Sequence, residues 1–124
     1  DCGASIPVEA ARDRVESGEG APTCDCGGVY KPDTVLFGEQ LPAAAMQEAR
    51  RRAETADVFL AAGSSLTVDP AGLLPDTALR NGAALVVVNL DQTKYAGRAD
   101  HVAREPVEEF LPAVSDRVSE LADR

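Results

Sequence analysis

The sequence is poor in aromatic residues, which make up 4% of its 124 positions and include no tryptophan. Hydrophobic residues nevertheless account for 44%, so the chain has enough apolar surface for a folded core and is not expected to be disordered. Such a core must be built from Ala, Val and Leu, as in parallel sheets that helices cover on both faces. The length predicts one domain or part of one.

Basic residues are also scarce, with 12 Lys and Arg against 21 Asp and Glu and a formal net charge of −9. Lysine occurs only at Lys31 and Lys94. This balance argues against direct nucleic-acid binding, which requires a basic surface. A lysine-poor, acidic surface fits a high-salt cytoplasm, where self-repulsion is screened, and fits an ordinary acidic protein equally well.

Long apolar runs are missing too. No run is long enough to cross a membrane, and no secretory signal is visible, so we expect a cytoplasmic protein without membrane contact. The chain opens at Asp1 without an initiator methionine, which predicts that it is part of a longer protein. Nothing in the sequence indicates an oligomeric state.

Cysteine occurs three times, at Cys2, Cys24 and Cys26, and this odd count does not fit a disulfide framework. Cysteines one residue apart pair poorly with each other, because a disulfide has a specific geometry. The spacing instead favours a zinc site of the ribbon type. Zinc takes four ligands, so we expect a fourth cysteine upstream of Asp1. His101 as a ligand and three unrelated thiols are the weaker alternatives.

Apolar patterning predicts that strands alternate with helices. Helices are expected over residues 7–17, 42–56 and 106–124, and a helical stretch broken at Pro75 is expected over 69–82. Apolar runs predict strands over residues 34–39, 57–63 and 83–90. Because these strands are apolar along their whole length, the pattern indicates an α/β fold with a parallel, Rossmann-like sheet flanked by helices.

The predicted domains are unequal. Residues 1–30 form part of a small zinc-binding module, which has too few apolar residues to fold without metal. Residues 31–124 form part of the Rossmann-like domain, which is the part expected to bind a nucleotide.

Ligands of such sheets bind beyond the carboxyl ends of the strands. Gly63, Ser64 and Ser65 follow one predicted strand and suit phosphate or ribose oxygens, while Asn89 and Asp91 follow another and suit a ribose hydroxyl. Taken alone, the Gly-Ser-Ser segment is more often a simple turn, and Asn89 and Asp91 are explained at least as well by a turn. The chain has no G-x-G-x-x-G and no phosphate loop, so most pyrophosphate contacts of a bound nucleotide must come from elsewhere. It also offers no plausible general base.

A series of motifs resembles the carboxyl-terminal half of the sirtuins, which are NAD-dependent protein-lysine deacylases. After an isolated cysteine come CDCGG, KPDTVLFGEQLP, AAGSSLTVDPAGLLP, GAALVVVNLDQT, ADHV and FLP, in that order. The resemblance runs from Cys2 to about Val114. It implies that Cys2, Cys24 and Cys26 are zinc ligands, although the family usually has C-x-x-C where this chain has C-x-C.

The resemblance also implies two sets of binding residues. The NAD contacts would be Gly63, Ser64, Ser65, Asn89, Leu90, Asp91 and Val107. The contacts to the acyl-lysine of a protein substrate would be Val35, Phe37, Gly38 and Glu39. The substrate backbone would add as a strand, with residues 66–69 as the opposing rail. Glu105 stands where the family commonly has glycine, and Val35 and Phe37 are alternatively plain core residues.

The family's glycine-rich loop, its Gln-Asn-x-Asp segment and its catalytic histidine lie upstream of the zinc module, and none occurs in this sequence. The resemblance therefore implies no catalytic residue in this chain. We expect the carboxyl-terminal part of an NAD- and zinc-containing deacylase that acts on acylated protein and is inactive as the 124-residue chain. The alternative is a non-catalytic module that binds zinc and a nucleotide.

Overall fold

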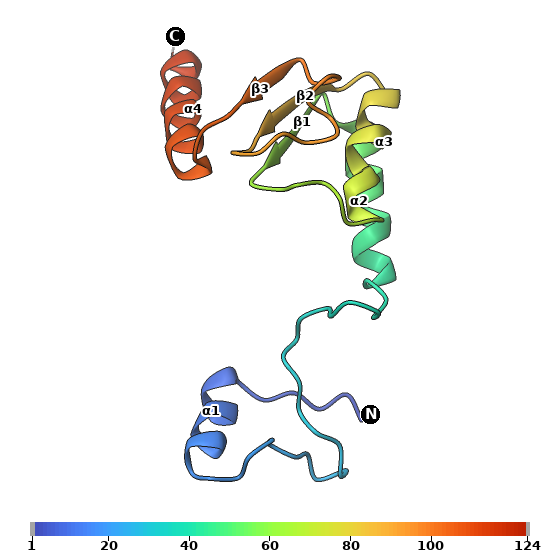
Figure 1. Ribbon diagram of the computed structural model, residues 1–124, viewed down its shortest axis with the longest axis vertical. Coiled ribbons are helices and arrows are strands. Elements are labelled where there is room, and N and C mark those ends of the chain that lie inside the picture. Colours follow the sequence, from blue (N-terminus) through green and yellow to red (C-terminus); the bar gives the residue numbers. More distant parts are fainter. Residues whose placement is uncertain (1, 124) are drawn as a thin grey trace. The chain divides into compact units, whose positions relative to one another are not determined.

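A computed structural model describes residues 2–123 of the protein. The chain forms two compact units, Asp1–Gln40 and Leu41–Arg124 (Figure 1).

The first unit contains one helix, α1 (Val8–Glu16), followed by loops. Pro7, with a φ of −57°, is preset for helix entry, and the helix ends where Gly18 takes a φ of +94°. The predicted helix is thus confirmed. No residue of α1 is buried, so this unit lacks an apolar core of ordinary size.

The strand expected over residues 34–39 is wrong. The segment is a turn in which the Glu39 amide donates to the Leu36 carbonyl over 3.0 Å, and Gly38 has a φ of +92°. Apolar composition favoured a strand, but among the described residues no neighbouring strand pairs with this segment. Without a partner strand, the segment forms a turn with its own backbone hydrogen bond.

The second unit is built on a three-stranded parallel sheet in the order β1, β2, β3. Its strands are β1 (Val58–Ala62), β2 (Ala84–Val88) and β3 (His101–Ala103). The first two coincide with predicted apolar runs, whereas β3 is only three residues long and its alternation was too short to predict. The α/β class with a parallel sheet is confirmed.

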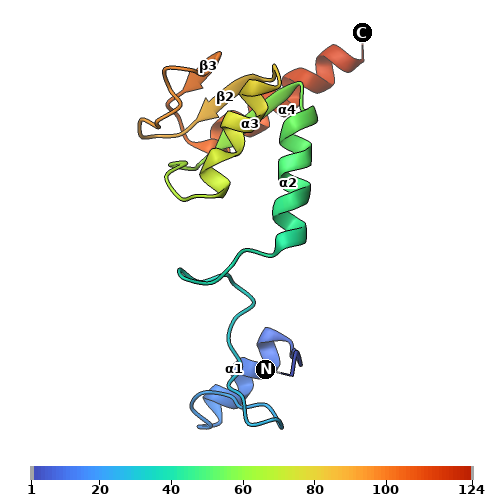
Figure 2. The same cartoon turned by 90° about the vertical axis from the view of Figure 1, so that its right-hand side faces the viewer.

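Helix α3 (Leu74–Arg80) packs on β1 and β2, and α2 (Ala43–Thr55) packs beside α3 in both views (Figures 1 and 2). The buried alanines Ala53 of α2 and Ala78 of α3 form one core cluster with Ala83. Small side chains allow this close packing, which explains how a core with few aromatic residues is filled. The helical stretch is interrupted between the short 3-10 helix η1 (Ala71–Leu73) and α3, just before the predicted position, and Pro75 lies in the first turn of α3.

The last helix, α4 (Val107–Ala122), follows Pro106 and has no buried residue. Its apolar stripe includes Leu111, Val114 and Val118, which are all exposed. Within residues 2–123, no helix has both the length and the apolar character needed to cross a membrane.

Candidate functional site

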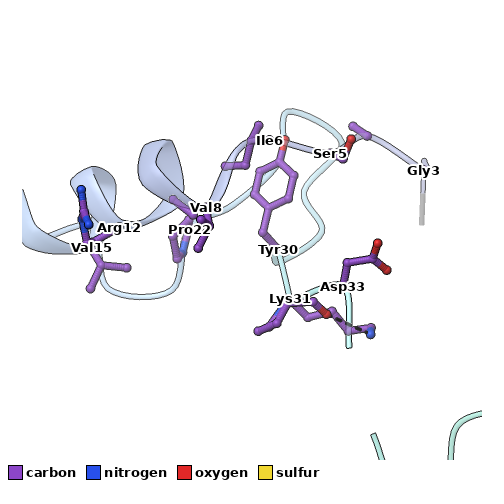
Figure 3. Close-up of a pocket in the computed structure, with 13 residues that line it drawn as sticks. Gly3, Ser5, Ile6, Val8, Arg12, Val15, Pro22, Tyr30, Lys31 and Asp33 are labelled. Atoms are coloured by element: carbon purple, nitrogen blue, oxygen red, sulfur yellow. Dashed lines mark hydrogen bonds between the residues drawn. The ribbon is translucent and has the colours of Figure 1, made fainter. Parts of the chain in front are cut away.

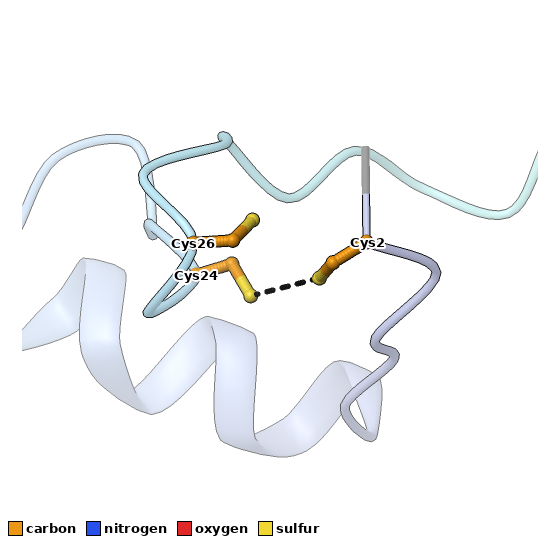
Figure 4. A group of neighbouring side chains, drawn as sticks. All are labelled: Cys2, Cys24 and Cys26. Carbon is orange, nitrogen blue, oxygen red and sulfur yellow. Dashed lines mark hydrogen bonds between the residues drawn. The ribbon is translucent and has the colours of Figure 1, made fainter.

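The three cysteines of the first unit lie together (Figure 4). Their sulfur atoms are all within 4.8 Å of one another, and the sulfurs of Cys2 and Cys24 are 3.6 Å apart. Zn–S bonds of about 2.3 Å in a tetrahedron place sulfurs roughly 3.8 Å apart. The donor set and the spacing therefore fit a zinc ion, and the three thiols are not scattered.

A tight turn brings Cys24 and Cys26 to this cluster. The Cys24 amide donates to the Gly28 carbonyl over 2.7 Å, and the Gly27 amide donates to the Cys24 carbonyl over 2.8 Å. Gly27 has a φ of +86°, a conformation that favours glycine. This turn lets a C-x-C spacing point both thiols to one side, as C-x-x-C does in ordinary knuckles.

The surroundings of Cys24 favour its thiolate. Hydrogen bonding from the Cys26 backbone, then from the Tyr30 hydroxyl and from Cys2, lowers the pKa of Cys24 to about 7. The hydrogen bond between Tyr30 and Cys24 in turn raises the pKa of Tyr30. Since zinc binds thiolate, a lowered pKa reduces the cost of deprotonation on metal binding.

His101 does not belong to the metal cluster in the part of the chain that the structure describes. It opens β3, and its ring stacks on that of Phe110 with 6.4 Å between centroids. The alternative of His101 as the fourth ligand receives no support.

In the second unit, the segments after β1 and β2 emerge at the same edge of the sheet. The strands are parallel and in register, with Ala62 opposite Val88. The Gly63 amide donates to the Val88 carbonyl over 2.9 Å, and the Asn89 amide donates to the Ala103 carbonyl over 3.1 Å. The carboxyl end of the sheet therefore brings Gly63 and Asn89 together.

Val107, the first residue of α4, lies at this edge as well. Gly63 has a φ of +62°, and a β-carbon added to it would lie 3.4 Å from Cγ2 of Val107. The residues expected around NAD, from three separate sequence segments, thus share one rim. The rim consists of Gly63, Ser64, Ser65, Asn89, Leu90, Asp91 and Val107.

Most side chains at this rim are exposed, and several satisfy the local backbone. Ser64 accepts from the Leu66 amide over 3.3 Å, and Asn89 donates its side-chain amide to the Asp91 carbonyl over 3.0 Å. Leu90 is 67% exposed. These hydrogen bonds shape the turns and leave the rim open to solvent. The rim residues therefore form turns and are at the same time accessible to a ligand.

The proposed substrate segment lies in the first unit, where it is exposed. Phe37 is 95% exposed and Val35 40%, so neither belongs to the core of this chain. Glu39 accepts hydrogen bonds from the Leu36 amide (3.0 Å) and from Lys31 (3.2 Å), which lower the pKa of its carboxyl. Glu39 therefore closes the turn that presents Phe37.

Sequence reasoning missed Lys31. Its ammonium donates to the carbonyls of Pro32 (3.3 Å) and Thr34 (3.1 Å) as well as to Glu39. One charged group thus gathers three acceptors around the turn of residues 34–39. Lys31 and Glu39 are eight residues apart, a separation that no regular helix or strand would bring together. No pattern in the sequence therefore indicates this contact.

Sequence reasoning also missed an open hollow of about 870 Å³ in the first unit (Figure 3). It is lined by the apolar face of α1, with Val8 and Val15, and by Tyr30. None of the predicted site residues lines it.

Comparisons with known proteins agree with the motifs. The profile of the Sir2 family matches residues 1–70. The chain is 50% identical over 119 residues to an NAD-dependent protein deacetylase of Haloarcula marismortui, which covers 95% of this chain and 46% of that protein. It is 49% identical over 108 residues to an NAD-dependent protein deacetylase of Sulfolobus acidocaldarius, which covers 87% and 42%. The chain thus spans about half the length of the curated relatives it matches.

Solved structures give the same result. A complex of Sir2 with a p53 peptide and NAD⁺ has a TM-score of 0.87 at 35% identity, covering 95% of this chain and 49% of that one. Sir2 bound to an acetylated peptide also has a TM-score of 0.87 at 35% identity, covering 95% and 50%. The resemblance found in the motifs is confirmed, and the chain belongs to the Sir2 family.

Proposed function

We propose that this chain is the carboxyl-terminal part of an NAD-dependent protein-lysine deacylase. The observation that carries the proposal is the shared rim, where Gly63, Asn89 and Val107 from three segments meet at the carboxyl end of a parallel sheet. This is where nucleotides bind in folds of this class. The relatives named NAD-dependent protein deacetylases support the same assignment.

Each segment of the rim would contribute contacts to NAD. The absence of a side chain at Gly63 allows close approach, Ser64 and Ser65 offer hydroxyls, and Asn89 and Asp91 offer polar groups to a ribose. When bound, NAD would supply the ribose carbon that the acyl oxygen of the substrate attacks as the bond to nicotinamide breaks. No residue of this chain is assigned the role of general base, so the proposal includes a further part of the enzyme that supplies one.

The turn of residues 34–39, the proposed substrate turn, would receive the acylated lysine. Acylation removes the lysine charge, so the apolar side chains of Val35 and Phe37 suit the modified side chain better than free lysine. Their exposure leaves them available for contact. Gly38 and Glu39 shape the turn, and an extended peptide would add beside it.

The zinc-binding module of residues 1–30 would have a structural role. Cys2, Cys24 and Cys26 would hold the ion with a fourth ligand from outside this chain, and residues 31–124 would belong to the nucleotide-binding domain. The ion would stabilise a unit whose helix buries no residue. We further propose a cytoplasmic location.

The test is an assay of nicotinamide release and peptide deacetylation with an acetyl-lysine peptide and NAD. We expect activity from the complete gene product and none from the 124-residue chain alone. A complete product that binds zinc and NAD without releasing nicotinamide would support the non-catalytic module instead. The coding sequence upstream of Asp1 gives an independent check, since a glycine-rich loop, a histidine and a further cysteine are expected there.

A further inference from the structure

Tyr95 is the largest fully buried side chain of the second unit. It is 2% exposed and packs in a core cluster with Leu66, Leu85 and Val87. It follows the proposed ribose-binding residue Asp91 by four positions. Its ring therefore anchors the segment that leaves β2.

The hydroxyl of Tyr95 reaches across to the segment that leaves β1. It donates to the Gly72 carbonyl oxygen and to Oδ2 of Asp76, each over 2.8 Å, so one proton is shared between two acceptors. The guanidinium of Arg98 pairs with Oδ1 of Asp76 and lies 5.7 Å from the centre of the Tyr95 ring. Arg98 therefore contacts both partners of this hydrogen bond, the Asp76 carboxylate and the Tyr95 ring.

The segment it reaches is tightly closed. The Gly72 amide donates to the Val68 carbonyl over 2.8 Å, and a β-carbon at Gly72 would lie 2.5 Å from the Leu66 carbonyl oxygen. Leu66 itself has a φ of +58° and is buried in the Tyr95 cluster. The loop of residues 63–72 is therefore fixed at two points, by the ring of Tyr95 at Leu66 and by its hydroxyl at Gly72.

We propose that Tyr95 is a positioning residue that holds the 63–72 loop and the 89–95 loop in the arrangement that binds NAD. The inference rests on the proposed function, which assigns Gly63–Ser65 and Asn89–Asp91 to the cofactor. Lys94 adds a second link between the same loops, with its ammonium 3.8 Å from the carboxylate of Asp69. A loop already held in its binding conformation loses less entropy when the ligand binds.

The experiment compares Tyr95→Phe with Asp100→Ala in the complete protein. Asp100 accepts a 2.8 Å hydrogen bond from the Leu85 amide at the amino end of β2, so its loss removes a comparable bond from the same sheet but away from the rim. Tyr95→Phe should raise KM for NAD about 3- to 10-fold and change kcat less than 2-fold. Asp100→Ala should leave KM for NAD unchanged.

Amide hydrogen exchange without NAD provides a readout that does not depend on activity. Tyr95→Phe should speed exchange in residues 66–73, whereas Asp100→Ala should speed it only near Leu85. If Tyr95→Phe does not fold, Asp76→Ala takes its place, because it keeps the ring and the contact to Gly72.

The outcomes separate the two proposals. An unmutated complete protein that does not bind NAD would overturn the proposed function and, with it, the role of Tyr95. Normal NAD binding that Tyr95→Phe leaves unchanged, or equal KM effects of both variants, would overturn the role of Tyr95 alone. Unchanged exchange in residues 66–73 would also overturn it.

Discussion

Gly63 and Val107 lie against each other at the carboxyl edge of the sheet, with only 3.4 Å between the position of a Gly63 β-carbon and Cγ2 of Val107. They are 44 residues apart in the sequence, and Gly63 opens the loop after β1 whereas Val107 opens α4. Any side chain at position 63 therefore meets both an unfavourable backbone conformation and a neighbour.

Gly63→Ala should weaken NAD binding by the complete protein about 10-fold or more, because the methyl group fills space at the rim that a bound ligand would occupy and strains a backbone with a φ of +62°. Isothermal titration with NAD measures this. Gly82→Ala is the matched control, since Gly82 has a φ of +89° with nothing within 4 Å of an added β-carbon. Both variants should lose about 1 kcal/mol of stability. Equal NAD affinity in the two variants would refute the assignment of Gly63.

Cys26→Ser should abolish stoichiometric zinc binding and lower the melting temperature of the first unit, because its helix buries nothing and depends on the metal cluster. Metal content by plasma mass spectrometry and thermal unfolding check this. Asp25→Asn changes the residue between the two cysteines and keeps all three thiols, so it should retain the metal. Full zinc content in Cys26→Ser would show that Cys26 is not a ligand.

In the complete protein, Lys31→Met should raise KM for an acetylated peptide about 3- to 10-fold and leave KM for NAD unchanged. The substitution keeps the length of the side chain but removes the ammonium that gathers Pro32, Thr34 and Glu39. Lys31→Arg retains the charge and should recover part of the loss. Steady-state kinetics with each substrate varied in turn measures the effect, and an equal change in both KM values would contradict it.

Asp76 should make stability depend on pH on the acid side. Hydrogen bonds from Arg98, then from Tyr95, lower the pKa of this carboxyl in the folded state. A lowered pKa means that the contribution is complete above the unfolded value, about 4, and is lost as pH falls through the folded value. The stability difference between the unmutated protein and Asp76→Asn should therefore be largest near pH 7 and shrink below pH 4.

Urea unfolding at pH 3 to 7 follows that difference. Glu120→Gln is a suitable control, since Glu120 also pairs with an arginine, Arg117, but both side chains are about 60% exposed. Its stability difference should be small at every pH. A gap between the unmutated protein and Asp76→Asn that widens toward pH 3 would exclude this role of Asp76.

The elements that were predictable from sequence are those whose signal is local. Val58–Ala62 and Ala84–Val88 are continuous apolar runs, and the Ala-rich Ala43–Thr55 has high helix propensity, so each could be placed without knowing its neighbours. The segment 34–39 failed for the opposite reason. Its residues favour a strand, but a strand also requires a partner, and local composition contains no information about one.

The candidate site divides in the same way. The glycine and serine after β1 and the asparagine after β2 could be identified because parallel topology places both strand ends at one edge. The contacts of Tyr95 with Gly72 and Asp76 span 23 and 19 residues and join loops of irregular length. Hydrogen bonds of this kind leave no periodic signal, so only coordinates show them.

The scarcity of lysine has a practical consequence. The two side-chain amines of this chain each lie at one proposed ligand loop, Lys31 bonded to the substrate turn of residues 34–39 and Lys94 opposite Asp69. An amine-reactive probe therefore has only two side-chain targets here, and a single mass spectrum resolves them. Protection of one by peptide and of the other by NAD would provide a footprint of both ligands without any mutation.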